Sequence, residues 1–209
     1  MRARLEALSL AAGLAVTVYA VFMRDEPLAR HMIQHGLFAC VAAPLIVLGG
    51  PVTLLLRRLS LRRRRDLMAV LQSRPLELLT HPLTAFALFV TCQWLCHVGP
   101  FFRLVERSET AHGAEHIAIL TTAILFWLPL VGHAPLRRRL RGVERCLYLS
   151  FAMPAVDLIG VWYIATGRKA AGAAMLASML PLGFAFIGVG WQWVASEHRR
   201  QLRREALGV

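Results

Sequence analysis

Two pairs of histidines in this sequence have a spacing that suits metal chemistry. His31 and His35 are four residues apart, and so are His112 and His116. On a helix, side chains four residues apart lie on the same face, about one turn from each other. Two imidazoles stacked in this way can hold a metal ion or haem iron. The alternative for each pair is a half-hydrated pair of histidines at a membrane boundary.

Two further groups of residues extend the same chemistry. Cys92 and Cys96 are also four residues apart, and His97 follows them directly. Thiolate and imidazole together suit Cu(I) or Zn(II). A free cysteine is also an ordinary buried apolar residue, which is the favoured interpretation of Cys92. Glu115, next to His116, can orient a ligating imidazole from outside the coordination sphere.

The pattern H-x-x-E-H at residues 112–116 also occurs in one class of zinc peptidases. A peptidase needs a third protein ligand and an open substrate cleft, and this short match supplies neither. The sequence also contains no P-loop, no G-x-G-x-x-G after a strand and no G-x-S-x-G nucleophile elbow. We therefore expect a protein that is not an enzyme.

The elements that carry these residues are long apolar segments. The chain is 57% hydrophobic and 17% charged, whereas soluble domains are about 45–50% apolar and about 25% charged. Six segments meet or approach the ~20 residues with which a helix crosses a bilayer. They are Leu5–Met23, His31–Leu56, Leu76–Phe102, His112–Gly132, Cys146–Ala165 and Ala170–Ala195. The first is longer than the roughly 7–15 apolar residues of a signal-peptide core, so we expect it to be retained as a span.

Only helices and closed barrels satisfy their own backbone in lipid, and the short alternating strands of a barrel are absent. The predicted fold class is therefore all-α: a polytopic membrane helical bundle of about six transmembrane helices. We expect residues 1–209 to form one integral-membrane domain, without a disulfide framework.

The positive charge predicts the orientation. The formal net charge is +12, and Lys169 is the single lysine among 24 basic residues. With a cytoplasmic N-terminus, 18 of these residues fall in cytoplasmic segments, including the run Arg62–Arg65. Because basic residues are enriched in cytoplasmic loops, we expect both termini in the cytoplasm. The arginines lie between apolar runs, where they fix topology and contact anionic lipid, so nucleic acid is not an expected partner.

This orientation places five of the eight histidines at the outer ends of three consecutive segments: His31, His35, His97, His112 and His116. The remaining three, His81, His133 and His198, lie toward the cytoplasmic side. Asp157 falls in the outer half of the fifth segment, where a carboxylate needs a partner. We expect that partner to be His97 or His116, with a hydrogen bond to Tyr163 or a backbone group as the alternative.

The order of several short motifs resembles a known family. The motifs are His31-Met-x-x-His35, Ala43-Pro44-Leu45, Leu48-Gly49-Gly50-Pro51, His81-Pro82, Trp94-x-x-His97, His112-x-x-Glu115-His116 and Phe126-Trp127-Leu128-Pro129. Over about Met32 to Met179 they resemble the CtaG family of multi-span cytochrome c oxidase assembly proteins, associated with caa-type oxidases. The resemblance implies a bacterial plasma-membrane bundle, multi-pass, that helps to build the haem–copper oxidase by supplying or inserting copper.

The resemblance also implies ligands and partners. The five clustered histidines match the family's histidine positions and become the candidate copper ligands. The position of Cys96 beside His97 makes it a further candidate ligand, and Glu115 and Asp157 are expected to support the ligands from outside the coordination sphere. Cytochrome c oxidase subunits, membrane lipids and copper chaperones are the expected partners. Two features depart from the family: many members have a seventh span, and Ala171-Gly172 is not followed by the usual Met-Trp pair.

Two other functions remain open at this point. A membrane haem protein or quinone-linked oxidoreductase also uses paired histidines on facing helices, although such pairs usually sit at two depths. A copper transporter is expected to have polar residues at several depths of the membrane. Asp157, His81 and His133 are compatible with this function. The sequence leaves open the metal, the true ligands among the histidines, the oxidase subunit addressed and the oligomeric state.

Overall fold

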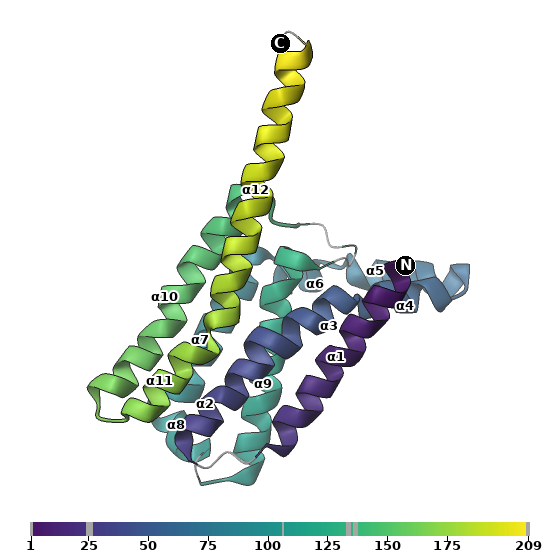
Figure 1. Ribbon diagram of the computed structural model, residues 1–209. Coiled ribbons are helices and arrows are strands. Elements are labelled where there is room, and N and C mark those ends of the chain that lie inside the picture. The colour runs from purple at the N-terminus through teal and green to yellow at the C-terminus, as the bar shows by residue number, and fades with distance from the viewer. Residues whose placement is uncertain (1, 24–26, 106, 133–134, 136–137, 208–209) are drawn as a thin grey trace.

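The computed structural model of the chain describes residues 2–23, 27–105, 107–132, 135 and 138–207, and over these residues it contains helices and no strand. The elements are α1 (Arg2–Phe22), α2 (Leu28–Gly36), the π-helix η1 (Leu37–Ala42), α3 (Ala43–Gly49), α4 (Pro51–Arg58), α5 (Leu61–Leu71), α6 (Arg74–Leu79), α7 (Pro82–His97), α8 (Pro100–Val105), α9 (Glu109–Val131), α10 (Val143–Ala165), α11 (Lys169–Ser178) and α12 (Leu180–Leu207). Figure 1 shows them packed as a bundle. The predicted all-α polytopic bundle is confirmed.

Five stretches of the described residues are long and apolar enough to cross a membrane: Ala3–Phe22, Leu28–Arg58, Glu109–Val131, Val143–Ala165 and Lys169–Leu207. The sixth apolar helix, α7, has 16 residues. At about 1.5 Å per residue it is about 24 Å long, shorter than the ~30 Å hydrocarbon core. The structure therefore has five full-length candidate spans and one short apolar helix, where the sequence predicts about six spans.

The shortness of α7 follows from its flanking residues. The predicted segment Leu76–Phe102 is divided because α6 ends at Leu79 and α7 begins at Pro82, where the missing proline N–H is tolerated in the first helical turn. At the other end, Gly99 has a φ of 92° and Pro100 begins α8. A left-handed glycine followed by proline ends a helix.

The second predicted segment is also divided. It is continuous from α2 through η1 to α3 and then turns at Gly50, which has a φ of 56° and ends α3. Pro51 follows as the first residue of α4. Gly49-Gly50-Pro51 thus breaks the segment, and the break separates its buried part from the basic helices α4 and α5.

The π-helix η1 is explained by Pro44 and Trp127. In π-helical bonding each carbonyl accepts from the N–H five residues later, and the Ala43 N–H indeed donates to the Phe38 carbonyl. The Ala39 carbonyl would then need an N–H from Pro44, which has none. The Trp127 indole N–H donates to the Ala39 carbonyl instead, at 2.8 Å. The Trp127 side chain of α9 thus stabilises the π-helical hydrogen bonding of η1, which begins just after His35.

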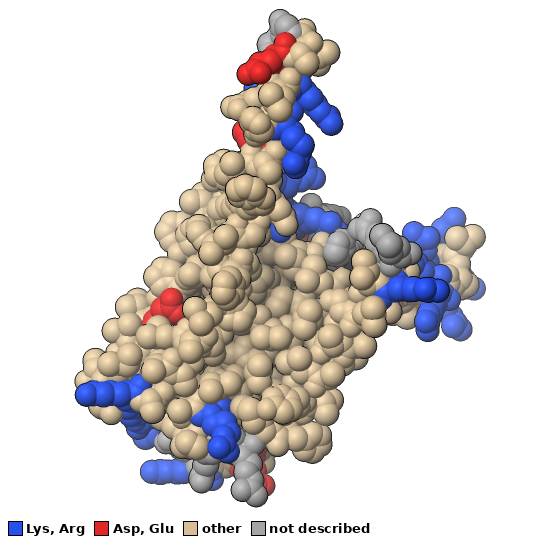
Figure 2. Space-filling model, in the orientation of Figure 1, with Lys and Arg blue, Asp and Glu red and all other residues tan. Residues whose placement is uncertain are grey.

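The two ends of the bundle differ in charge. In Figure 1 the start of α1 and the end of α12 lie at the same end as α4, α5 and α6, and the last part of α12 extends beyond the bundle. Figure 2 shows basic side chains on these projecting parts, a broad band below them in which one acidic group is visible, and fewer basic side chains at the lower edge. Large apolar side chains in the band are exposed, such as Phe22 at 82% and Phe184 at 69%. In a membrane these side chains face lipid.

Close helix packing fixes the position of α2. A Cβ atom on Gly36 would lie 2.2 Å from the Ser178 Cβ of α11, so only glycine permits this approach. On the other side, the Gln34 side-chain amide donates to the Ala20 carbonyl at 2.7 Å, which satisfies a carbonyl in the last turn of α1. These contacts hold the residues on both sides of His35.

Candidate functional site

The structure brings His31, His35, His97, His112 and His116 together at the end of the bundle opposite to the arginine-rich helices α4 and α5. His31 and His35 come from α2, His97 is the last residue of α7, and the other two lie in the first turns of α9. We call these five residues and Glu115 the histidine cluster. Its members converge because the ends of three apolar helices meet here.

The imidazole rings of the histidine cluster are in direct contact. Ring centroids are 4.0 Å apart for His31 and His35, 4.3 Å for His112 and His116, and 5.0 Å for His31 and His112. His35 also lies 5.3 Å from His116. The two rings of each pair at four-residue spacing are therefore neighbours, as the helix geometry predicts, with interplanar angles of 59° and 66°, and the two pairs face each other between α2 and α9.

A chain of hydrogen bonds determines where the protons of two histidines lie. The Nδ1 atom of His97 is 2.7 Å from the Gln93 carbonyl, which can only accept, so Nδ1–H donates. In the neutral ring the Nε2 atom of His97 then accepts from the Nδ1–H of His35, at 2.9 Å. The Nε2 atom of His35 consequently carries a lone pair, and among the described residues it has no hydrogen-bond partner.

Glu115 lies at the centre of the histidine cluster and is fully buried. Its Oε2 atom is 3.6 Å from the Nε2 atoms of both His31 and His35. Neither carboxylate oxygen has a hydrogen-bond partner among the described residues. Since a buried carboxylate without hydrogen bonds is costly, this geometry fits a site that a cation completes.

Two sets of three side chains could hold one metal ion, each with its ligand atoms within 4.8 Å of one another: His31, His35 and His116, and also His31, His112 and Glu115. Metal–ligand distances of about 2.0–2.2 Å allow ligand atoms to be at most about 4.4 Å apart. Ligand atoms near the 4.8 Å limit would close on an ion after small side-chain movements. Glu115, expected to support a ligand, is itself placed in one of the sets.

His97 and Cys96 are placed beside these sets. Both ring nitrogens of His97 form hydrogen bonds, so the ring orients His35 and has no lone pair left for an ion. Cys96 is buried, with its Sγ 3.8 Å from the Sγ of Cys92. Both thiols are close enough to Glu115 to interact with it electrostatically. The cysteine pair therefore adjoins the histidine cluster without entering either set.

Asp157 does not join the histidine cluster. Among the described residues it forms no ion pair or hydrogen bond with His97 or His116, and its Oδ1 atom has no hydrogen-bond partner. Its electrostatic neighbour is the Cys40 thiol. Tyr163, the alternative partner, donates instead to the His97 carbonyl at 2.8 Å. The expected pairing of Asp157 with His97 or His116 is therefore not present among the described residues, and it is Tyr163, six residues further along α10, that contacts the end of α7.

Sequence reasoning missed the two residues that hold His97. Gln93 supplies the carbonyl that orients the ring, and Tyr163 fixes the backbone. Because Gln93 acts through its backbone carbonyl, its residue type carried no signal of this role. His81 and His198 lie away from the cluster, His81 as the N-cap of α7. His133, Arg24 and Arg137 lie outside the described residues.

These features define a multi-span helical membrane protein with a buried cluster of imidazoles and one carboxylate at one end. The sequence profile described as "Cytochrome c oxidase caa3 assembly factor (Caa3_CtaG)" matches residues 5–196. The chain belongs to this family of assembly factors, which confirms the resemblance seen in the short motifs.

Three mycobacterial proteins are similar to the chain. Uncharacterized protein Mb0105 of Mycobacterium bovis and uncharacterized protein MT0111 of Mycobacterium tuberculosis are each 30% identical over 205 residues, covering 84% of this chain. Uncharacterized protein ML1998 of Mycobacterium leprae is 28% identical with the same coverage. The chain spans about a third of these relatives, 31% of the length of each. No solved structure matches the chain.

Proposed function

We propose that this protein assists the assembly of a caa3-type cytochrome c oxidase in the bacterial plasma membrane by binding copper in the histidine cluster. The copper is cargo, received at the non-cytoplasmic face from a copper chaperone and passed to an oxidase subunit. Family membership supports the role in oxidase assembly. The observation that carries the copper site is the set of His31, His35 and His116, whose ligand atoms lie within 4.8 Å of one another.

The donor atoms suit copper. Imidazole nitrogen binds copper well, and Cu²⁺ is the strongest binder among the divalent first-row metals. The hydrogen-bond chain leaves a lone pair on the Nε2 atom of His35, which is a member of this set. Glu115, 3.6 Å away, supplies a negative charge that offsets the loss of hydration when a cation enters a buried site.

The other candidate functions fit this geometry less well. Haem bound by histidines of facing helices needs a porphyrin between the two rings, and the rings of His31 on α2 and His112 on α9 are already in contact, with centroids 5.0 Å apart. A transporter needs ligands at several depths, whereas the five clustered histidines lie at one end. A peptidase of the H-x-x-E-H type needs an open cleft, whereas Glu115 is fully buried.

The test is copper binding by the full chain purified in detergent. The metal-free protein is titrated with Cu(I) against a coloured Cu(I) chelator. We expect one copper per wild-type chain and at least a tenfold weaker affinity in the double variant His35→Ala/His116→Ala. His198→Ala, which removes an exposed imidazole from α12, is the matched control and should bind like wild type.

The second arm measures the oxidase in cells. A strain without its own copy of the protein receives each variant, and the copper content and activity of its oxidase are compared. The double variant should leave the oxidase short of copper, whereas the His198→Ala variant should restore it. Equal copper binding by the double variant and wild type would refute the site. Weak binding together with a normal oxidase would refute the delivery role.

A further inference from the structure

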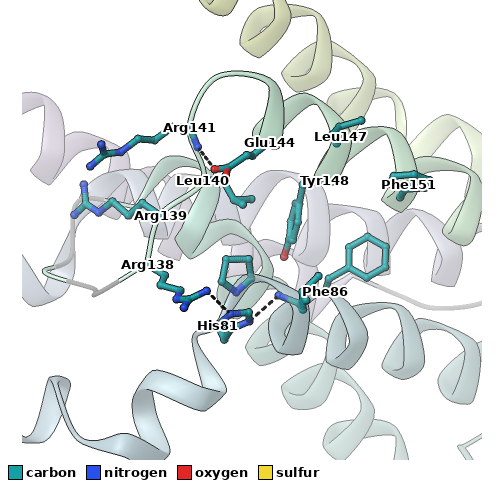
Figure 3. A pocket seen from close by; sticks show the side chains of 12 residues that line it. His81, Phe86, Arg138, Arg139, Leu140, Arg141, Glu144, Leu147, Tyr148 and Phe151 are labelled. Atoms are coloured by element: carbon teal, nitrogen blue, oxygen red, sulfur yellow. Dashed lines mark hydrogen bonds between the residues drawn. The ribbon is translucent and has the colours of Figure 1, made fainter.

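A cavity of about 660 Å³ lies at the arginine-rich end of the molecule, far from the histidine cluster (Figure 3). It is formed where the start of α7 meets the segment 138–141 and the first turns of α10. His81 marks the beginning of α7 and His97 its end. The cavity and the histidine cluster are thus separated by the whole length of this helix.

One wall of the cavity is apolar and continuous with the lipid-facing surface. Phe86 and Tyr148 form its inner part, with ring centroids 5.4 Å apart. Leu147 and Phe151 continue the wall outward along α10 and are 51% and 65% exposed. Because these outer side chains face the hydrocarbon of a bilayer, an acyl chain can reach the cavity sideways from the membrane.

The other side of the cavity is basic. Arg138, Arg139 and Arg141 are among its lining residues; in Figure 3 the Arg138 side chain points toward His81, whereas those of Arg139 and Arg141 point outward, away from the apolar wall. Among the described residues of this lining, Glu144 is the single carboxylate, and its Oε2 atom accepts the backbone N–H of Arg141 at 3.0 Å. The lining therefore carries a net positive charge above an apolar wall.

His81 indicates where an anion would bind. Its Nδ1 atom faces the Leu83 backbone N–H at 3.3 Å, and its Nε2 atom faces the Arg138 guanidinium at 3.3 Å. Both neighbours are donors, yet a neutral imidazole can accept at only one nitrogen because the other carries the proton. If Nδ1 accepts from Leu83, as the N-cap requires, the Nε2–H group and the Arg138 guanidinium both need an acceptor. An oxygen of an anion beside them would satisfy both.

We propose that this cavity binds an anionic phospholipid, with its phosphate held by His81 and Arg138 and one acyl chain along Leu147 and Phe151. Basic pockets beside transmembrane helices on the cytoplasmic side are suited to anionic lipid headgroups. The apolar wall distinguishes this site from a surface patch, because it needs a ligand that is acidic at one end and aliphatic at the other. Free phosphate would accept from His81 and Arg138 but would leave the apolar wall without a ligand.

The test uses native mass spectrometry of the full chain in mild detergent, with phosphatidylglycerol, phosphatidylcholine or inorganic phosphate added. We expect one tightly retained phosphatidylglycerol per chain and several-fold less phosphatidylcholine. The variant Arg138→Gln/Arg141→Gln should retain roughly tenfold less phosphatidylglycerol. The variant Leu147→Trp, which narrows the cavity without a change of charge, should also lose the lipid.

The control variant is Arg62→Gln/Arg63→Gln, which removes the same charge from α5, outside the cavity. It should retain phosphatidylglycerol like wild type, and circular dichroism should show the same helix content in all variants. Equal retention of the two lipids, or an equal loss in the control, would show only general attraction to a charged surface and would overturn the site. Displacement of the lipid by millimolar phosphate would overturn it in favour of a free anion.

Discussion

At the scale of single residues, the position of His97 between Gln93 and His35 predicts a role in orienting a ligand. The variant His97→Phe removes the acceptor of the His35 Nδ1–H and should weaken copper binding by about 10- to 100-fold, as loss of a residue that orients a metal ligand does. One copper per chain should still bind at saturation. Competition titration with a Cu(I) chelator measures both quantities.

The conservative variant His97→Gln serves as the control for this prediction. Its side-chain oxygen can accept the His35 N–H, so it should recover most of the affinity. A direct ligand would behave differently: His97→Gln and His97→Phe would then be equally weak, and the number of bound copper ions would fall. That result would show that His97 binds the copper ion directly and does not only orient His35.

Glu115 is expected to affect stability and metal binding in opposite directions. The metal-free protein buries an acidic side chain whose oxygens have no hydrogen-bond partner among the described residues. Glu115→Gln removes the charge at nearly constant volume, so thermal unfolding of the metal-free protein should shift upward, while copper affinity should fall about tenfold or more. Unfolding curves with and without copper measure both. A downward shift without metal would mean that the carboxylate stabilises the empty bundle.

The candidate site was predictable from the sequence only in part. The spacing of the histidine pairs and the charge bias place five imidazoles at one depth, and the structure has them there. Neither the spacing nor the charge bias predicts how a helix is rotated about its own axis, and hence which neighbouring helix each side chain faces. Asp157 was therefore assigned to the correct half of α10 but to the wrong neighbours. Gln93 acts through its backbone carbonyl, which every residue type possesses, so its identity gave no signal.

At the scale of elements, the approach of α2 to α11 depends on Gly36. A methyl group there would lie 2.2 Å from the Ser178 Cβ, so Gly36→Ala must push the helices apart. Overpacking of this kind costs about 1–3 kcal/mol, and we expect a lower melting temperature and weaker copper binding through His35. Gly188→Ala in α12 is the control, because a Cβ there meets nothing within 4 Å. Equal melting temperatures for the two variants would contradict the close contact.

The π-helix predicts coupling between Pro44 and Trp127. Trp127→Phe removes the donor to the buried Ala39 carbonyl and should destabilise the protein by about 1–3 kcal/mol. Pro44→Ala restores a backbone N–H that can donate to the same carbonyl. The double variant should therefore lose less stability than the sum of the single variants. Chemical unfolding of all four proteins measures the coupling, and simple additivity would refute this account of η1.

The bounds of the helices were also predictable from the sequence only in part. Gly50 followed by Pro51 is a local signal, and the break it predicts is present. The predicted third span was too long because the total apolar length was counted across Pro82 and Gly99, each of which bounds a helix. The π-helix depends on a hydrogen bond from Trp127, distant in the sequence, so Pro44 alone could not distinguish it from a simple kink.

At the scale of the whole molecule, the arginine-rich helices α4 and α5 and the histidine cluster lie at opposite ends of an apolar band. If the arginine-rich end is cytoplasmic, copper delivery takes place on the other side of the membrane. Green fluorescent protein fused after residue 209 should fluoresce, whereas alkaline phosphatase fused there should be inactive.

The charge distribution makes this orientation sensitive to one segment. The run Arg62–Arg65 supplies four of the arginines on the cytoplasmic side, so replacing all four with alanine should allow a fraction of the chains to insert inverted. Phosphatase activity of the C-terminal fusion would then rise from background. Replacing Arg103, Arg107 and Arg168, which lie toward the opposite side, should leave it at background, because the bias only increases. Active phosphatase on the unaltered chain would place the histidine cluster in the cytoplasm and would require copper delivery from that side.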